Sequence, residues 1–182
     1  MSGKTFYTLD RAGTLVEDVL IEYQDAFNPI DELREHIENR FWQKVSRHGN
    51  NYLFNYNINL LSSNENSSVF MEMLLEERRR SNFPNKPSRF RSLFACDTVR
   101  EAAWFRGSCM ANLSTAIYEV HSESVCHKAD MRLLNVNCTP AEMSHRLDLY
   151  WQGKTKELYP GYEPFWEVLV PLPVAIGKRI QE

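Results

Sequence analysis

The segment "LFACDTVREAAWF" (residues 93–105) places a strand directly before a helix. Its apolar beginning is typical of a short buried strand. Asp97 or Thr98 then offers the side-chain oxygen that caps a following helix rich in good helix formers. Phe94 and Phe105 lie eleven positions apart, one on each element. The stretch therefore predicts a strand–turn–helix unit that carries two aromatic side chains.

The rest of the chain mixes the same two kinds of element without a regular strand–helix alternation. Strands are expected at residues 5–9, 89–97, 115–123 and 130–137, with one or two more within 165–180. Helices are expected at residues 29–49, 69–80, 98–113 and 139–153, with Gly49 ending the first and Ser67 or Ser68 capping the second. Residues 14–27 fit either state. This mixture predicts one α+β domain over residues 1–182, with an antiparallel or mixed sheet.

Composition excludes several classes of protein. The chain has 182 residues and a net charge of −3, so it is not a general binder of polyanions. No apolar run reaches the roughly 20 residues of a membrane helix, and the first residues do not resemble a secretory signal. The four cysteines and five histidines lack metal-site spacing. We therefore expect a cytoplasmic protein with reduced thiols, no metal and no membrane association.

A single carboxylate, Glu167, lies in the middle of the apolar segment "PFWEVLVPLPV" (residues 164–174). Taken alone, this position fits the solvent-facing side of an alternating strand. The alternative is that a rigid strand holds the acid for chemistry. The segment by itself leaves both readings open.

Three segments in order resemble the ADP-ribosyltransferase superfamily, closest to its diphtheria-toxin-like branch. They are "FYTLDRAG" (6–13), "LFACDTVREAAWF" (93–105) and "WEVLVP" (166–171). The resemblance implies a split mixed or antiparallel β-sheet core with flanking helices. It also implies that NAD is the substrate and that Glu167 is the catalytic acid. A helical or loop insert at about residues 28–85 matches no segment of that family.

The resemblance also implies a set of NAD-binding residues, with Phe94 and Phe105 enclosing the nicotinamide. Thr8 stands at the family's histidine place and offers one hydroxyl instead of an imidazole. Arg11 or Arg89 would then contact the phosphates. The full set of expected cofactor-binding residues is Tyr7, Thr8, Arg11, Arg89, Ser92, Phe94, Ala95 and Phe105.

The proposed chemistry needs few groups. Breaking the nicotinamide–ribose bond creates an oxocarbenium-like centre, as in glycoside cleavage. One preorganised carboxylate beside that ribose stabilises the developing charge, and aromatic walls hold the cationic leaving ring. Phe165 lies two residues before Glu167, where arginine-modifying members carry Gln or Glu, so modification of arginine is disfavoured.

The acceptor is suggested by local charge. Residues 78–106 carry eight Arg or Lys against two acids, Asp97 and Glu101, in a chain of net charge −3. This surplus slightly favours a nucleic acid, RNA or DNA, over a protein acceptor. The residues expected to contact it are Arg78, Arg79, Arg80 and Arg91.

Small enzymes of this appearance resemble bacterial toxins of toxin–antitoxin and anti-phage modules, which implies an antitoxin and sometimes a chaperone as partners. Two other functions remain open. One is an inactive module of the same fold that binds nucleic acid or a partner protein, and the other is a pure NAD hydrolase.

Overall fold

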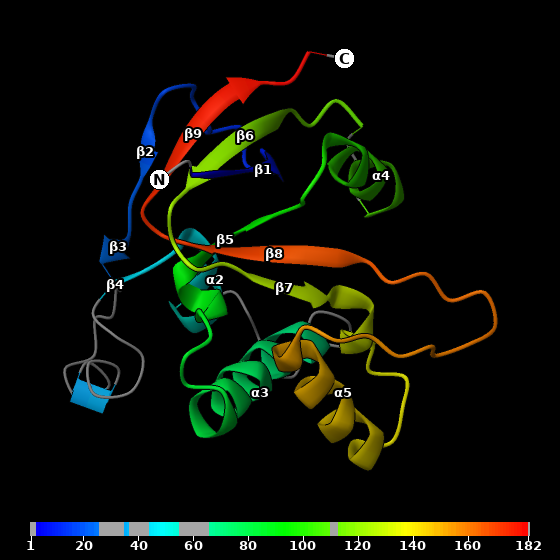
Figure 1. Ribbon diagram of the computed structural model, residues 1–182. Helices are drawn as coiled ribbons and strands as arrows, with labels where there is room; N and C mark the ends of the chain where they lie inside the picture. Colours follow the sequence, from blue (N-terminus) through cyan, green and yellow to red (C-terminus); the bar gives the residue numbers. More distant parts are fainter. Residues whose placement is uncertain (1–2, 26–34, 37–43, 55–65, 110–112, 182) are drawn as a thin grey trace.

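A computed structural model describes residues 3–25, 35–36, 44–54, 66–109 and 113–181 (Figure 1). Its strands are β1 (Lys4–Leu9), β2 (Leu20–Ile21), β3 (Gln24–Asp25), β4 (Lys44–Val45), β5 (Ser92–Ala95), β6 (Ile117–Ser122), β7 (His127–Asp130), β8 (Trp166–Pro171) and β9 (Val174–Arg179). Its α-helices are α2 (Arg47–Phe54), α3 (Asn66–Asn82), α4 (Val99–Cys109) and α5 (Pro140–Gln152). Two short 3₁₀ helices are η1 (Arg89–Arg91) and η2 (Met131–Leu134).

The described strands pair only in antiparallel fashion, which confirms the α+β class. One sheet has the order β1-β6-β9-β2, a second has the order β5-β8-β7, and β3 pairs with β4. An isolated bridge between Tyr7 and Cys96 links the two larger sheets, since each residue's N–H donates to the other's carbonyl. The strand end that leads into α4 is thereby fixed against β1.

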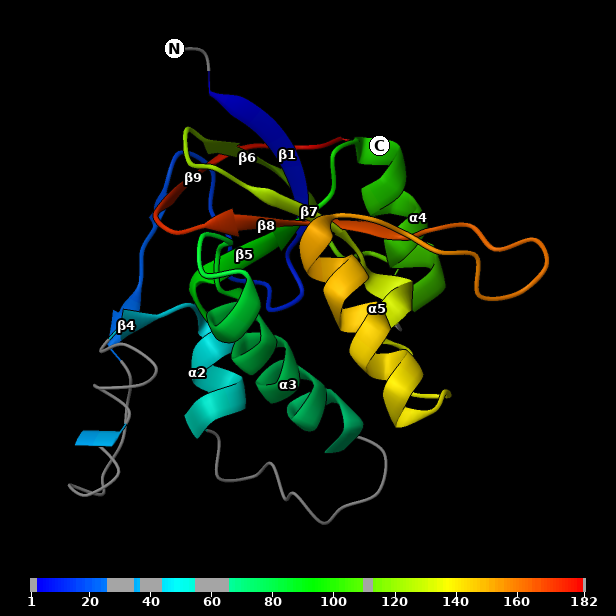
Figure 2. The ribbon, with the colours of Figure 1, turned by 60° about the horizontal axis from the view of Figure 1, so that its bottom comes forward.

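The molecule is layered around the β5-β8-β7 sheet (Figures 1 and 2). One face of this sheet packs on the β1-β6-β9-β2 sheet through a core that includes Phe6, Val120, Val168 and Ile176. Its other face packs on α3 and α5 through the residues Met71, Leu75, Ala129, Leu147, Tyr150, Trp151 and Leu169. A side chain of β8 therefore points either into the inter-sheet core or toward the helices.

Local capping signals account for the helices that the sequence predicted well. The backbone N–H of Thr98 donates to the carboxylate of Glu101, and the Glu101 N–H donates to the Thr98 hydroxyl, which forms a capping box at α4. Thr139 caps α5, Pro140 opens it, and Gly153 ends it at a φ of 69°. The predicted caps of these two helices are thus confirmed, with Thr98 in preference to Asp97.

Tertiary contacts overrode the local pattern in the second quarter of the chain. Residues 29–34 and 37–43 of the predicted first helix lie outside the described residues. Its last part is wrong, because Lys44–Val45 forms a strand and Gly49 lies inside α2 instead of ending a helix. The N–H of Ser46 donates to the Phe90 carbonyl, so this segment is fixed by η1 rather than by its own propensity.

Two further expectations need correction, and the state of one open segment is resolved. Ser67 and Ser68 lie within α3, which begins at Asn66, so neither is its N-cap. The strand expected at residues 130–137 is wrong, because the Asp130 side chain accepts from the Arg132 N–H and starts η2. The open segment 14–27 forms two-residue strands, β2 and β3, within its described part.

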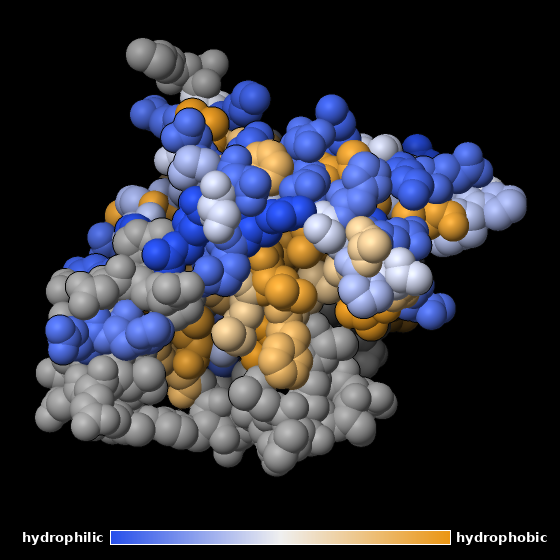
Figure 3. Space-filling view, turned by 90° about the horizontal axis from the view of Figure 1, so that it is seen from below, coloured by the Kyte–Doolittle hydropathy of each residue, from blue (hydrophilic) through white to orange (hydrophobic). Residues whose placement is uncertain are grey.

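The helix α3 is apolar on both its inner and its outer face. Met71 and Leu75 are buried against the sheet, whereas Phe70, Met73 and Leu74 are exposed. Figure 3 shows apolar surface on this helical side of the molecule. The sequence of α3 therefore does not reveal which of its faces lies inward. None of the helices that the structure describes is both long and apolar enough to cross a membrane.

The packing of α5 on β7 makes stability depend on pH through His127. The His127 ring stacks on Trp151 with centroids 5.4 Å apart, and its Nε2 lies 3.0 Å from the carbonyl oxygen of Tyr150. Burial lowers the pKa of His127 from 6.5 to about 4. The unfolded chain then binds a proton at a higher pH than the folded protein does. Stability from the neutral imidazole is complete above pH 6.5 and is lost as the pH falls toward 4.

We expect the free energy of unfolding to fall by about 2 kcal/mol between pH 7 and pH 5 because of this one group. Urea unfolding of the wild type and of His127→Phe at both pH values measures the effect. The variant should lose most of the pH dependence in this range. An equal pH dependence in the two proteins would show that His127 is not its source.

Candidate functional site

Glu167 is buried on the helical side of β8. The residue is 5 % exposed, whereas Val168 and Val170 of the same strand point into the opposite, inter-sheet core. The strand is held on both sides, since Ala129 of β7 pairs with Glu167 and Ala95 of β5 pairs with Val168. The solvent-facing reading of this residue is therefore wrong.

Asp130 fixes the backbone at the beginning of β8. Its Oδ1 accepts the N–H of Phe165 at 2.9 Å, and its Oδ2 accepts the hydroxyls of Thr155 and Tyr162. The loop before the strand is thereby tied to the end of β7. The carboxylate of Glu167, two residues further on, projects from a rigid backbone.

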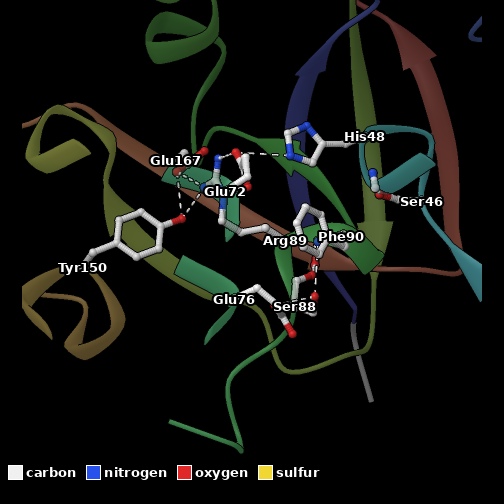
Figure 4. Close-up of polar contacts among 11 residues, drawn as sticks. Ser46, His48, Glu72, Glu76, Ser88, Arg89, Phe90, Tyr150 and Glu167 are labelled. Atoms are coloured by element: carbon white, nitrogen blue, oxygen red, sulfur yellow. Dashed lines mark hydrogen bonds and ion pairs between the residues drawn. The ribbon is translucent and has the colours of Figure 1, made fainter. Parts of the chain in front are cut away.

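A buried arginine contacts the carboxylate of Glu167. Arg89 opens η1, whose N-cap is Ser88, and its Nη1 donates to Glu167 Oε1 at 2.5 Å. The remaining edge of the guanidinium binds Glu72 of α3. Nε donates to Oε2 of Glu72 and Nη2 donates to Oε1, each at 2.8 Å. Arg89 thus joins two acids from two different elements (Figure 4).

Tyr150 of α5 supplies a second donor to the same oxygen of Glu167. Its hydroxyl donates to Glu167 Oε1 at 2.8 Å and accepts from Arg89 Nη1. Burial raises the pKa of Tyr150 well above its ordinary value, and the nearby Glu167 raises it further, so the hydroxyl remains a donor. Among the residues the structure describes, none donates a hydrogen bond to Oε2 of Glu167. One oxygen is held and the other is free to meet a ligand.

The charges of this cluster do not balance by themselves. Burial opposes ionisation of Glu72, but Arg89 and His48 outweigh it and lower the pKa of Glu72 to about 2. Burial likewise opposes the charge on Arg89, but Glu167 and Glu72 raise the pKa of Arg89 well above its usual range. Two carboxylates therefore share one guanidinium in a place with little water.

His48 of α2 lies at the outer edge of the cluster. Its Nε2 is 3.2 Å from Glu72 Oε1, and its ring centroid is 4.6 Å from that of Phe94. The guanidinium of Arg89 lies 4.6 Å from the same Phe94 ring. Phe94 therefore contacts both a cation and an imidazole next to Glu167.

Gly49 allows α2 to bring His48 this close. A Cβ at Gly49 would lie 2.3 Å from the carbonyl oxygen of Phe90, which is far inside van der Waals contact with backbone. Gly49→Ala should therefore lower the free energy of unfolding by about 1–3 kcal/mol, as overpacking does.

The matched control is Gly107→Ala in α4, where no atom lies within 4 Å of the added methyl group. Alanine there should be neutral or stabilise by up to about 1 kcal/mol through helix propensity. Chemical unfolding of both variants measures the difference. Similar stability for the two variants would contradict a close contact at Gly49.

The two aromatic residues predicted to enclose nicotinamide lie in different clusters. Phe94 packs with the helical core next to Arg89, whereas Phe105 stacks on Phe165 at 5.0 Å between centroids. Trp104 lies 5.2 Å from the same Phe165 ring. Phe94 is paired with Leu169 in the later half of β8, whereas Phe105 contacts the residue just before the strand, so the two rings do not form the two walls of one site.

The other predicted NAD-binding residues lie around the junction of the two sheets or apart from it. Thr8 donates its hydroxyl to the Phe94 carbonyl at 2.7 Å, and Tyr7 forms the bridge to Cys96. Ala95 is buried in the inter-sheet core, and Ser92 donates its hydroxyl to the Ser88 carbonyl. Arg11 is exposed in the turn after β1, away from the contacts of the Arg89 cluster.

Much of the basic segment is engaged within the protein. Arg78 pairs with Asp148 at 2.8 Å, and Arg79 is buried with Nη2 2.8 Å from Glu76. Arg91 lies over the ring of Tyr23, and Arg80 is half-buried on α3. These four arginines do not form one free cationic surface, which weakens the charge argument for a nucleic-acid acceptor.

Sequence reasoning missed three members of the cluster, namely His48, Glu72 and Tyr150. Two of them lie within residues 28–85, the segment for which no role was expected. The one signal present in the sequence is the placement of Glu72 between two methionines in an apolar stretch. An acid in such surroundings needs a partner when it is buried.

Comparison with known proteins identifies a family without assigning an activity. A family model described as "Protein of unknown function (DUF2441)" matches residues 12–182, which include the whole Glu167 cluster. A search of the curated proteins gives no match. Because the family model covers most of the chain, the chain belongs to the DUF2441 family.

Proposed function

We propose that this member of the DUF2441 family is an NAD-dependent ADP-ribosyltransferase in which Glu167 is the catalytic residue. The observation that carries the proposal is the state of Glu167, a buried carboxylate fixed through Oε1 with Oε2 unpartnered among the described residues. One oxygen of Glu167 is held in place while the other can meet a ligand, which is the arrangement that a catalytic carboxylate requires. The sequence resemblance in three ordered segments supports the same assignment.

The reaction breaks the bond between C1′ of the ribose and the nicotinamide nitrogen. The bonding electrons move to the nicotinamide ring, which leaves neutral, and positive charge develops at C1′ and the ring oxygen. A nucleophile on the acceptor forms the new bond to C1′ and gives up its proton to water. Oε2 of Glu167 would accept a hydrogen bond from a ribose hydroxyl and stabilise the charge at C1′.

Arg89 and Tyr150 would orient Glu167 during this step. Both of their donors bind Oε1, which fixes the position of that oxygen. Burial of all three groups keeps water from competing for these bonds. Arg89 is therefore proposed as a positioning residue for Glu167 instead of a ligand of the NAD phosphates.

The arrangement of the sheets supports the finer fold proposal. Two antiparallel sheets face each other and join at the Tyr7–Cys96 bridge, next to the strand–helix unit of residues 92–109. We propose that this is an ADP-ribosyltransferase-like split sheet. In that arrangement Thr8, Phe94 and Phe105 remain the residues proposed to bind NAD alongside β8.

A thermal-shift titration with NAD tests binding. Saturating NAD at about 100 times its Kd should add about 2.7 kcal/mol to the free energy of unfolding and raise the melting temperature accordingly. Adenosine diphosphate ribose serves as the control ligand, since it is NAD without the nicotinamide ring that the aromatic residues would hold. No stabilisation by NAD at millimolar concentration would contradict the proposal.

Mass spectrometry of RNA, DNA and protein after incubation with NAD identifies the acceptor. An added ADP-ribose on one of them supports transfer and names the acceptor class. Free ADP-ribose together with nicotinamide, without a modified macromolecule, indicates hydrolysis instead of transfer. Unchanged NAD in every mixture would contradict both activities.

A further inference from the structure

Arg89 divides its hydrogen bonds between two acids in an unequal way. Glu72 occupies Nε and Nη2 in the bidentate manner typical of arginine–carboxylate pairs. Glu167 receives only Nη1, and only through one of its oxygens. The guanidinium is therefore oriented by Glu72, and Glu167 meets the edge that remains.

A guanidinium without Glu72 would have a better geometry available. Two adjacent N–H groups of an arginine match the two oxygens of one carboxylate. If Glu72 were absent, Arg89 would gain a second charge-assisted hydrogen bond by turning toward Glu167. That bond would occupy Oε2, the oxygen that the proposed reaction requires to be free.

The charge balance makes such a rearrangement favourable. Glu72 and Glu167 together exceed the charge of Arg89 by one unit, with His48 as the nearest further group to Glu72. Removal of Glu72 leaves one guanidinium and one carboxylate, a neutral pair that is tolerated in a buried place. Glu167 alone can therefore balance the positive charge of Arg89, and the fold does not need Glu72 for this.

We propose that Glu72 is a positioning residue, which holds Arg89 by two donors so that Oε2 of Glu167 stays open to substrate. This inference rests on the proposed catalytic role of Glu167. It assigns a function to α3, which the resemblance to known enzymes did not cover.

Glu76, one turn further along α3, provides a matched control. It is also a buried carboxylate and binds an arginine, Arg79, together with the hydroxyl of Ser88. Neither Arg79 nor Ser88 contacts Glu167 in the described structure. Glu76→Ala removes the same chemical group from the same helix without reaching the catalytic carboxylate.

Nicotinamide release by Glu72→Ala, Glu76→Ala and the wild type gives the kinetic test. Glu72→Ala should lose about 10- to 100-fold in kcat, with KM for NAD little changed. In the variant, the charge-assisted hydrogen bond from Arg89 to Oε2 of Glu167 must be broken before Oε2 can act, and the expected loss is the effect of breaking that one bond. Glu76→Ala should keep kcat within about 3-fold of the wild type. An unchanged kcat in Glu72→Ala, or an equal loss in both variants, would overturn the inference.

A crystal structure of Glu72→Ala gives a test that does not depend on activity. Arg89 should donate to both oxygens of Glu167. If Arg89 still donates only to Oε1 of Glu167 in the variant, the inference is overturned. If Glu72→Ala does not fold, Glu72→Gln serves in both tests. Glutamine keeps the shape of the glutamate side chain, but it offers one acceptor oxygen in place of the two that hold Arg89.

The two proposals can fail separately. A wild type that releases no nicotinamide contradicts the proposed function, and the role of Glu72 in orienting Arg89 is then decided by the crystal structure. A wild type that is active, with Arg89 unmoved in the variant, leaves the proposed function intact and removes Glu72 from it.

Discussion

Arg89→Met lowers the free energy of unfolding by about 3–5 kcal/mol, because it leaves two buried carboxylates without their common cation. Glu72 loses two charge-assisted hydrogen bonds and Glu167 loses one, and both side chains are buried. Methionine fills a similar volume, so the loss measures charge compensation more than packing. Urea unfolding monitored by fluorescence quantifies the effect.

Arg78→Met is the control for this experiment. Arg78 also pairs with a carboxylate, Asp148, but the two side chains are 28 % and 34 % exposed. A pair in contact with water contributes about 0–1 kcal/mol. Equal losses for Arg89→Met and Arg78→Met would mean that the Glu72–Arg89–Glu167 cluster is not held together as described.

Glu167→Gln should reduce nicotinamide release by about 10²- to 10⁴-fold while the fold survives. The amide oxygen of glutamine still accepts from Tyr150, and the change leaves Glu72 and Arg89 as a neutral pair. Only the negative charge beside the ribose is lost. Steady-state release of nicotinamide and a thermal melt of the same sample separate the loss of activity from the loss of stability.

Glu163→Gln is the matched change for this prediction. Glu163 lies four residues earlier in the loop before β8 and is exposed. Its substitution should change neither nicotinamide release nor stability. A Glu167→Gln protein that retains the wild-type rate would remove Glu167 from the catalytic role.

Local signals predicted the parts of the fold that local interactions build. The helix caps at Thr98 and Thr139 depend on atoms within a few residues, so the sequence contains the whole cause. The strand around Glu167 was predicted from its run of apolar residues, although its partners β5 and β7 lie far away in the sequence. Residues 130–137 were predicted wrongly because Asp130, whose N-cap bond starts η2, lies at the end of a strand instead of at the beginning of one.

The candidate site was predictable only at the residues that a motif marks. Glu167 and Arg89 were both named from the sequence, although Arg89 was expected on phosphates and instead lies between two acids. Their other partners come from far along the chain, since Tyr150 is 61 residues from Arg89 and Glu72 is 95 residues before Glu167. No periodicity relates such positions, and only the packing of α3 and α5 on the sheet brings them together.

The helix α3 illustrates why the segment 28–85 had no expected role. Its apolar residues occur on the inner and the outer face alike, so the sequence pattern does not place Glu72 inward. In a strictly amphipathic helix, the pattern of apolar residues would have placed Glu72 on the buried face and thereby indicated that it has a partner.

The release of nicotinamide from NAD by the purified wild-type protein is the most direct measurement of the central claim. Chromatography of the reaction with and without a mixture of RNA, DNA and protein acceptors quantifies both nicotinamide and remaining NAD. We expect nicotinamide to appear in proportion to enzyme and time, and to be absent with Glu167→Gln. Intact NAD after prolonged incubation with folded wild-type protein and all acceptors would contradict the assignment of this chain as an NAD-cleaving enzyme.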